Sequence, residues 1–568
     1  MKTLLAACCF AALSSLSAEV VSAQQQSPDI SPLETVQKLY GEQKWEEVVR
    51  LARGQTIPSA EFCYLYGMAL AHLNRWQEAR DAFTAGIRQA PKDTRLLTER
   101  AGAEYRLQNY SDAKSDLHLA LTLNPKDEYT LNFLGTIYLL EGNTEAALKY
   151  WNRTEKPRLA RVTLAPKPAA NEALVARAIA FNAPQTLDLG AFRTTEARLE
   201  NLGIFPQVRL ELVPAGESDY DAILHLGERG GWEYSHWTGA LSLLSGVPYQ
   251  TVYPEWYDIG GRAINFSSMA RWDSQKRRAS ASLTFPIGHQ SDRVVAISVD
   301  GRDENWNLSQ TFTGTASPIT DLNLRRIEAA VELRSVVNGN WSWTAGAGVI
   351  ARSFVNGDAN ASLAGAPFFT NSTSLEASVS VKRAMIRVPE RRFTVTGSVE
   401  SHFGRGFKES LGPFGSAGGS LHAEWLPHAK GEDDAIHVSV RGADLFGNVA
   451  LDQLFELGLD RDSPLWLRGH GATTDGRKGR APLGRRYVLI NSEYDKNVYN
   501  GGFFRLSAGP FLDTGKITDD SAMFGDPRWL VDTGAQIKLR VLGSVSIAIS
   551  YGRDLRNGRG AFFGTSER

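Results

Sequence analysis

Residues 341–349 read Trp-Ser-Trp-Thr-Ala-Gly-Ala-Gly-Val, a stretch in which large or apolar residues alternate with small or polar ones. A period of two is typical of a β-strand, because successive side chains of a strand point to opposite faces of its sheet. The same alternation recurs along the C-terminal part of the chain, at 279–285, 295–299, 327–333, 375–381, 436–440 and 545–551. These repeated strands predict a large antiparallel sheet within residues 230–568.

The spacing of the strands and the character of their faces indicate a membrane barrel. Short turns at 338–340 and 389–390 alternate with longer loops at 355–372, 403–417 and 444–484. One face of each strand is apolar, with Trp and Tyr nearby, and the other face is polar or small. This pattern predicts a transmembrane antiparallel β-barrel of about 16 strands, with the apolar face toward lipid and the polar face toward a wet lumen. A large soluble β-sandwich or propeller is the alternative.

Composition narrows the classes of function. A chain of 568 residues with 42% hydrophobic residues is too long for one ordinary domain and too apolar for a disordered one. Lys and Arg number 62 against 63 Asp and Glu, so the basic excess of a nucleic-acid binder is missing. Cys8, Cys9 and Cys63 are too few for a disulfide framework, and we expect Cys63 to be a buried small hydrophobe. Because no catalytic, cofactor-binding or metal-binding motif occurs, we expect no enzyme activity, no cofactor and no metal.

The N-terminal residues predict export. Lys2 is followed by the apolar run 4–13 and by the small residues that end at Val21-Ser22-Ala23. A basic start, a short apolar run and a small-residue cleavage site are typical of a signal peptide, here residues 1–23. The alternative is a membrane anchor, for which the run is short because a spanning helix needs about 20 apolar residues.

Residues 24–156 are rich in helix-forming residues and repeat with a period of 34. The positions expected to pack where helices cross, or to close a helix, are Gly67, Ala79, Pro91, Ala113, Pro125, Gly135 and Ala147. A helix–turn–helix unit of this length resembles the tetratricopeptide repeat, so we expect an all-α solenoid. Such arrays bind extended peptides or other proteins, which implies a protein partner or client. An unrelated helical bundle is the alternative.

Residues 157–229 have a different pattern. We expect a strand at 159–164, helices at 172–181 and 194–202, and strands at 207–213 and 220–226. The run 197–208, which contains Arg198-Leu199, Gly203, Phe205 and Val208, resembles the end of the helix in a POTRA domain. That α+β domain precedes the barrel in the Omp85 superfamily of outer-membrane proteins. A generic small α+β domain is the alternative.

The longest loop carries a second resemblance. Its residues 465–470 read Leu-Trp-Leu-Arg-Gly-His. They resemble the Val-Arg-Gly-Phe/Tyr tip of the loop that folds back into the Omp85 lumen, with Leu467 a conservative replacement and Arg468 and Gly469 matching. His470 departs from the family pattern, because an aromatic residue usually follows the glycine.

A strand motif downstream completes this comparison. Phe511, Asp513 and Gly515 fit the family's Phe-x-Asp-x-Gly pattern. An arginine carried into a narrow lumen needs a fixed carboxylate partner, since an unpaired buried charge is costly. The resemblance therefore implies that Arg468 pairs with Asp513, and Glu493 on the preceding strand is a second candidate partner.

Together these resemblances imply an Omp85-superfamily protein of the BamA/TamA or surface-antigen D15 type. We expect an outer-membrane location in a Gram-negative-type bacterium, with residues 24–229 in the periplasm and residues 230–568 in contact with outer-membrane lipid. The implied function is insertion or translocation of proteins, with no nucleic-acid partner. Two alternatives remain open, a polysaccharide exporter with a repeat scaffold and a structural or adhesive surface barrel.

Overall fold

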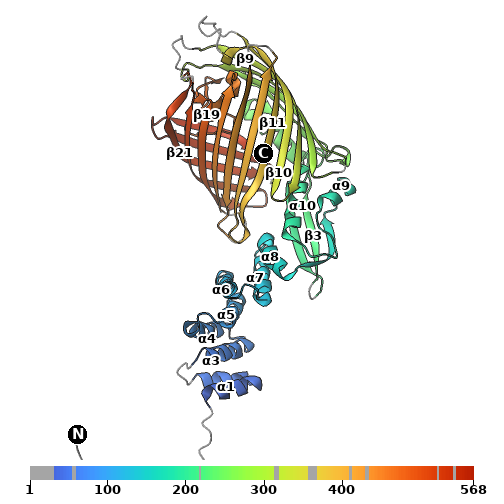
Figure 1. Cartoon of the computed structure of the whole chain (residues 1–568), viewed down its shortest axis with the longest axis vertical. Coiled ribbons are helices and arrows are strands. Elements are labelled where there is room, and N and C mark those ends of the chain that lie inside the picture. Colours follow the sequence, from blue (N-terminus) through green and yellow to red (C-terminus); the bar gives the residue numbers. More distant parts are fainter. Residues whose placement is uncertain are drawn as a thin grey trace, which may run out of the picture. The chain divides into compact units, whose positions relative to one another are not determined.

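The computed structural model describes residues 31–53, 59–216, 219–233, 235–288, 290–312, 319–355, 367–407, 412–428, 434–520, 523–541 and 545–567. The predicted signal peptide, residues 1–23, lies outside the described residues. The chain forms two compact units, the first ending at Thr130 and the second beginning at Leu131 (Figure 1).

The first unit is a helical repeat region. Its helices are α1 (Pro32–Gly41), α2 (Trp45–Ala52), α3 (Ala60–His72), α4 (Trp76–Gln89), α5 (Thr94–Arg106) and α6 (Tyr110–Leu123), and α7 (Glu128–Leu140) begins at its end. Several of these helices begin at a polar side chain that caps the first turn. The side-chain oxygen accepts a hydrogen bond from a backbone N–H group that has no partner within the helix. Ser31 Oγ accepts from the Glu34 amide at 3.2 Å, and Ser59 Oγ accepts from the Phe62 amide at 3.2 Å.

Small residues lie where paired helices cross. A Cβ atom at Gly67 would overlap the ring of Phe83, and one at Gly135 would overlap the indole of Trp151. The side chains of Ala79, Ala113 and Ala147 are fully buried. Large residues at these positions would hold the helices apart. Small residues are therefore required at the same place in each repeat, and their spacing of 34 residues is visible in the sequence. Pro91 and Pro125 are exposed and follow the ends of α4 and α6.

The second unit begins with the end of the repeats and a small α+β segment. The elements are α8 (Thr144–Trp151), η1 (Asn152–Thr154), β1 (Arg158–Ala165), α9 (Glu172–Ala178), α10 (Leu189–Asn201), β2 (Gln207–Pro214) and β3 (Asp219–Gly227). Strand β3 is central, since it pairs in parallel with β1 and antiparallel with β2. Phe192 and Leu199 of α10 are buried together with Leu224 of β3. The expected order of strand, helix, helix, strand, strand is therefore observed.

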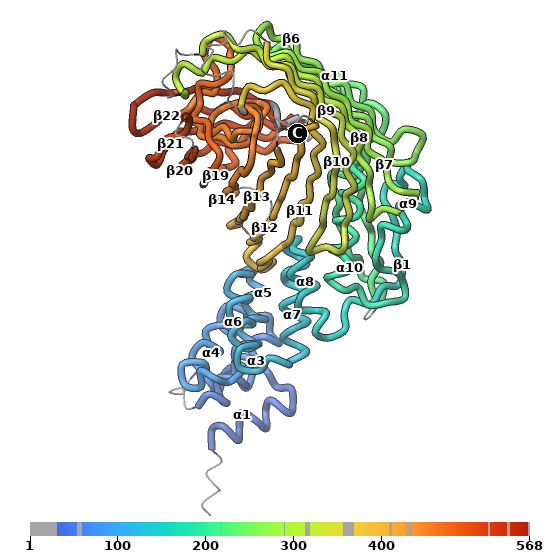
Figure 2. The backbone as a smooth tube through the Cα atoms, turned by 45° about the horizontal axis from the view of Figure 1, so that its top comes forward, coloured from blue at the N-terminus to red at the C-terminus, as the bar shows by residue number. Residues whose placement is uncertain are grey.

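The rest of the second unit is a closed barrel of long antiparallel strands (Figures 1 and 2). In the described residues its long strands are β6 (Asn265–Trp272), β7 (Lys276–Pro286), β8 (Arg293–Trp306), β9 (Leu322–Asn338), β10 (Trp341–Val355), β11 (Ser372–Val388), β12 (Phe393–Gly406), β13 (Pro413–Trp425), β14 (Asp434–Gly447), β19 (Arg486–Asn500), β20 (Phe504–Thr518), β21 (Gly525–Val541), β22 (Val545–Asp554) and β23 (Gly560–Glu567). Two short strands, β4 (Thr251–Val252) and β5 (Glu255–Trp256), pair with β6. Helix α11 (His236–Leu244) and the short helix η2 (Val247–Tyr249) precede them, and η3 (Ile259–Gly261) follows.

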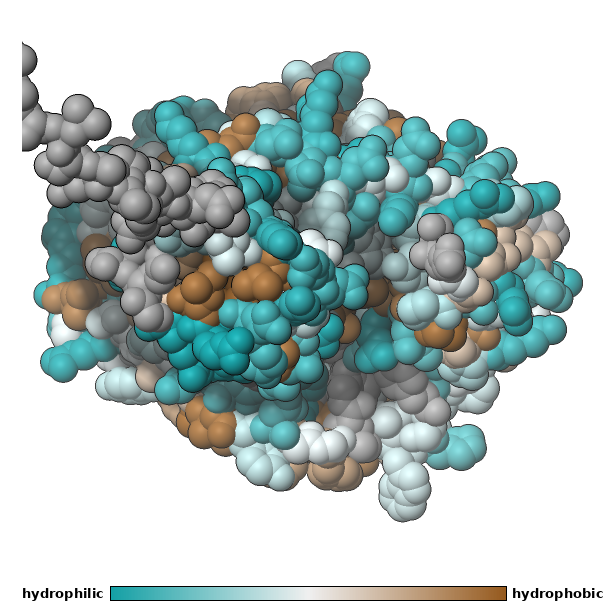
Figure 3. All heavy atoms as spheres, turned by 90° about the horizontal axis from the view of Figure 1, so that it is seen from below, coloured by the Kyte–Doolittle hydropathy of each residue, from teal (hydrophilic) through white to brown (hydrophobic). Residues whose placement is uncertain are grey.

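The strand faces differ as the period of two requires. Val331 is 49% exposed, Val379 50% and Val399 64%, so the apolar residues of neighbouring strands form the outer surface. Charged side chains at alternate positions, such as Arg326 and Arg352, contact Asp452 inside the barrel, and Trp341 and Trp425 lie at the ends of their strands. An outer apolar surface beside aromatic residues is the surface that a lipid bilayer stabilises. The face of the molecule seen from below is mostly hydrophilic by contrast (Figure 3).

Among the described residues, no helix combines the length and the apolar character needed to cross a bilayer.

Candidate functional site

The loop that joins β14 to β19, residues 448–485, lies inside the barrel and is called the inner loop. It contains η6 (Leu451–Gln453) and the short strands β15 (Phe455–Glu456), β16 (Thr473–Thr474), β17 (Arg477–Lys478) and β18 (Leu483–Gly484). Its Leu457 and Leu467 are fully buried against Leu489, Ile517 and other inward residues of the wall. An apolar base of this kind explains why the loop folds back, because burial of apolar surface favours packing over exposure to a wet lumen.

Arg468 is the best-anchored side chain of the inner loop. Its Nε and Nη2 donate to the two carboxylate oxygens of Asp513 at 2.8 and 2.7 Å, and its backbone N–H donates to Asp513 Oδ2 at 3.0 Å. Its Nη1 donates to Glu493 at 2.9 Å and to Gln536 at 2.8 Å. A forked contact of this type fixes position as well as charge. The structure thus brings together Arg468 and both carboxylates that the sequence suggested.

The strand motif on β20 has a physical reason at each of its three positions. The Phe511 ring lies beneath the guanidinium, with Cζ of Arg468 3.7 Å from the ring centre. Asp513 is completely buried and supplies the carboxylate. A Cβ at Gly515 would come within 3.3 Å of Leu467 Cδ1, so the glycine leaves room for the loop's leucine. Residues two apart in a strand lie on the same face, so the three motif residues together face the tip of the inner loop from the barrel wall.

The next two residues of the tip contact β21 and β22. The Gly469 amide donates to Asp532 Oδ2 at 2.6 Å, and a Cβ at Gly469 would overlap that carboxyl group and the backbone of Asp554. His470 Nδ1 lies 2.9 Å from Asp532 Oδ2, while its Nε2 lies 3.6 Å from Asp554 Oδ2. His470, which departs from the aromatic pattern, is therefore placed between two acids.

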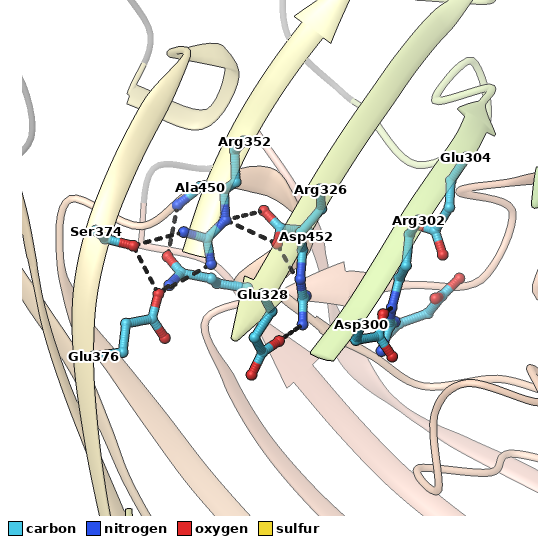
Figure 4. Close-up of polar contacts among 12 residues, drawn as sticks. Asp300, Arg302, Glu304, Arg326, Glu328, Arg352, Ser374, Glu376, Ala450 and Asp452 are labelled. Atoms are coloured by element: carbon cyan, nitrogen blue, oxygen red, sulfur yellow. Dashed lines mark hydrogen bonds and ion pairs between the residues drawn. The ribbon is translucent and has the colours of Figure 1, made fainter. Parts of the chain in front are cut away.

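A second anchor of the inner loop is Asp452, in η6. Arg326 on β9 and Arg352 on β10 both point at its carboxylate (Figure 4). Arg352 Nε lies 2.9 Å from each oxygen, and Arg326 Nη1 lies 3.1 Å from Oδ2. The Asp452 side chain is only 4% exposed, so this is a buried cluster with one carboxylate and two cations. Glu328 and Glu376 pair with the outer sides of these arginines.

A third anchor joins the loop to the first strands of the barrel. Asp462 accepts from Arg271 on β6 at 2.7 Å and from Arg278 on β7 at 2.6 Å. Nearby, Lys478 Nζ lies 3.7 Å from Glu304 on β8 and 3.4 Å from Asp460. The inner loop is thus held by ionic contacts to strands on several sides of the barrel wall.

Sequence reasoning assigned no partner to Asp452, Asp462 or Lys478. Charged residues inside the predicted strands were the available signal, since Arg326, Glu328 and Arg352 are placed on the face opposite the apolar one. This pattern indicates which side chains face inward, but it does not indicate which residues they contact.

Two groups of histidine and carboxylate could hold a metal ion, judged from the described residues. In the first, His437 lies near Glu493 and Asp495, but Lys538 Nζ contacts both carboxylates at 2.9 and 2.8 Å. Lys538 pairs with both acids and Arg468 also pairs with Glu493, so the two carboxylates already have two cations beside them. The second group is His470, Asp532 and Asp554.

Helix α8 contacts one end of the barrel, at the turn η5 (Pro389–Arg391) between β11 and β12. Tyr150 Oη donates to Glu390 at 2.8 Å, and Lys149 Nζ lies 2.5 Å from the same carboxylate. Burial alone would raise the pKa of Glu390, but the hydrogen bonds from Lys149 and Tyr150 outweigh it and lower the pKa below its ordinary value. The last repeat helix is therefore attached directly to a barrel turn.

Helix α10 contacts the same end of the barrel. The Gly339 amide, between β9 and β10, donates to Thr194 Oγ1 at 3.1 Å. Arg193 donates to Glu145 of α8 at 3.0 and 3.1 Å, which joins the α+β segment to the last repeat helix. Burial, followed by the charges of Glu145 and Glu200, raises the pKa of Glu196 to about 8.

No protein-family model matches the chain, and neither does any curated protein. Among solved structures, BamA from Haemophilus ducreyi lacking POTRA domains 1–3 is similar over 72% of this chain and 84% of its own, with 13% identity and a TM-score of 0.41. CdiB from Escherichia coli is similar over 72% of this chain and 75% of its own, with 13% identity and a TM-score of 0.46. The first TPR of Spaghetti, bound to an HSP90 peptide, is similar over 17% of this chain and 75% of its own, with 28% identity and a TM-score of 0.17.

Proposed function

We propose that this chain, an Omp85-type barrel preceded by a tetratricopeptide-like helical region and a POTRA-like segment, resides in the outer membrane and inserts or translocates proteins there. The helical region and the POTRA-like segment would then lie in the periplasm. The apolar outer wall would contact lipid.

The observation that carries the proposal is the anchored tip of the inner loop. Arg468 is bound by Asp513 and Glu493 and stacks on Phe511. A structural or adhesive barrel has no need of a loop that fills its lumen and is bound by buried ion pairs. The POTRA-like segment and the sequence patterns around Arg468 and Asp513 also argue against an exporter of polysaccharide.

The contacts of α8 and α10 support a role for the helical region. Repeat arrays bind extended peptides or proteins. Tyr150 and Lys149 of α8 contact the barrel turn at Glu390, so the last repeat helix is joined to the barrel. This contact is consistent with the proposal that the helical region recruits a client or an assembly partner.

The test is depletion of the protein followed by quantitative proteomics of the outer membrane and of the medium. Loss of specific outer-membrane proteins supports insertion, and loss of a secreted protein supports translocation. Re-expression of the wild type should restore the lost proteins, whereas Arg468→Ala should restore them only in part. An unchanged protein profile together with loss of surface polysaccharide would refute the proposal in favour of the exporter.

A further inference from the structure

One carboxylate of the helical region has no cation of its own. Glu99 lies on α5, and its side chain is only partly exposed. None of the described residues forms an ion pair or a hydrogen bond with its carboxylate. Burial raises the pKa of Glu99 above its ordinary value. A partly buried carboxylate without a positive partner is costly, so this position favours the approach of a cation.

A cation on the same face of α5 is already bound elsewhere. Arg95 precedes Glu99 by four residues, a spacing at which side chains on a helix can meet. Its guanidinium lies instead over the ring of Tyr64, 4.9 Å from the ring centre. It also pairs with Glu61 at 2.8 Å and with Asp93 at 2.9 Å. These two carboxylates compensate Arg95, which leaves the charge of Glu99 available to a ligand.

Three tyrosines from three helices lie near Glu99. Tyr40 is on α1, Tyr64 on α3 and Tyr129 on α7. Burial, followed by the charge of Glu99, raises the pKa of each phenol, so the four side chains are close together. Tyr129 follows Arg95 by 34 residues, so the two hold the same place in successive repeats and lie on the same face. Tyr129 is 63% exposed, which leaves this face open to a ligand.

The charges beside these tyrosines are mostly negative. Glu61 lies beside Tyr64, and Asp127 lies beside Tyr129. Arg95 contributes a positive charge near Tyr64, but its own ion pairs offset it. A surface of this sign attracts a basic segment and repels an acidic one.

We infer that Glu99 and the three tyrosines, together called the tyrosine face, bind a lysine or arginine side chain of an extended polypeptide. Aromatic rings attract a cation through their negative faces, and the carboxylate supplies the opposite charge. The contact of Arg95 with Tyr64 shows the same chemistry within the chain. The inference rests on the proposed recruitment by the repeats, and it adds the kind of residue that the recruited protein presents.

The experiment uses the full chain, purified in detergent and labelled with a fluorophore, on an array of short peptides of randomised sequence. We expect the bound peptides to be enriched in lysine or arginine by at least about threefold over the array. Glu99→Gln keeps the shape of the side chain and removes its charge, so it should abolish this enrichment. Tyr129→Leu should weaken the enrichment, and because Tyr129 is largely exposed, this variant should fold.

The best-binding peptide is then measured in solution by fluorescence anisotropy. Replacement of its basic residue by norleucine should weaken binding to the wild type roughly tenfold and binding to Glu99→Gln hardly at all, because the two changes remove the same contact. Asp112→Asn is the matched control, because it removes one exposed negative charge on α6 and leaves the tyrosine face intact. Its binding should equal that of the wild type.

Bound peptides without an excess of basic residues, or with an excess of acidic ones, would overturn the inference. An array that retains no peptide would also overturn it. Equal losses in Asp112→Asn and Glu99→Gln would do the same, because they would show a general effect of charge. The depletion experiment tests recruitment separately, since the array can fail while depletion still removes specific proteins. Failure of this inference is therefore distinguishable from failure of the proposed function.

Discussion

Replacement of Arg468 by alanine should release the tip of the inner loop. Asp513 receives four hydrogen bonds, two from the guanidinium, one from the Arg468 amide and one from Asn491. The substitution removes the two charged bonds and leaves the other two. Breaking a buried ion pair from one side costs about 3–5 kcal/mol, and the remaining donors place this case at about 3 kcal/mol.

The other neighbours of Arg468 change this figure little. Glu493 keeps Lys538 at 2.9 Å and Gln536 at 2.9 Å, so it stays compensated. Loss of the stacking contact with Phe511 adds about 1 kcal/mol. We therefore expect Arg468→Ala to lower the free energy of unfolding by about 3–4 kcal/mol and to raise pore conductance.

Equilibrium unfolding in urea and detergent, followed by tryptophan fluorescence, measures the first quantity, and planar-bilayer recording measures the second. Arg477→Ala is the control in the same loop, because it removes only a 3.5 Å ion pair with Asp321 and one exposed 2.9 Å hydrogen bond to the Thr320 carbonyl oxygen, so it should cost about 1 kcal/mol. Arg468→Lys should restore little, since an ammonium cannot form the fork.

A double-mutant cycle decides whether the contact is the cause. Asp513→Ala should resemble Arg468→Ala, and the double variant should be little worse than either, with a coupling of about 2–3 kcal/mol. Effects that add within about 0.5 kcal/mol would refute the reasoning, because independent residues share no contact.

Three further predictions concern the regions outside the strands. Gly67→Ala should lower stability by about 1–3 kcal/mol although alanine favours helix, because the new methyl group meets Phe83; thermal unfolding measures it, and a stabilised variant would contradict the packing. Burial favours the neutral form of Glu196 and raises its pKa to about 8 in the folded chain, against 4.5 in the unfolded chain. The protonated side chain therefore contributes fully to the free energy of unfolding below about pH 4.5, and this contribution is lost as the pH rises through 8. Glu196→Gln should accordingly gain in melting temperature over the wild type at about pH 9 but not at about pH 5, and an equal difference at both values would refute this. Glu390→Gln should weaken the contacts with Lys149 and speed hydrogen exchange in α8, where unchanged exchange would show that the contact is unimportant.

Local patterns predicted most of the fold and the loop tip. Alternation along a strand fixes which residues face outward, so the exposed Val331 and Val379 were readable from the chain. The three inward residues of the motif at Phe511 share one short strand segment, and the contact with Arg468 followed from a family resemblance and the need to pair a charge.

The remaining contacts of the inner loop could not be predicted because they join distant segments. Asp452 lies 100 residues from Arg352 and 126 from Arg326. Such a pair depends on how the barrel closes and on where the loop turns inside it, and no local period contains this information. His470 was read only as a departure from a pattern, since its two acids come from different strands.

The distribution of the loop's contacts has a consequence for how the chain assembles. Asp462 and His470 are close in sequence, but the first contacts Arg271 and Arg278 on early strands and the second contacts Asp532 and Asp554 on late ones. A nascent barrel must bring its two ends together, which costs loop-closure entropy. A loop that is already bound to the early strands would offer its tip as a binding site for β21 and β22. The two ends of the sheet would then meet across a short distance, and the entropy cost of closing the barrel would be smaller.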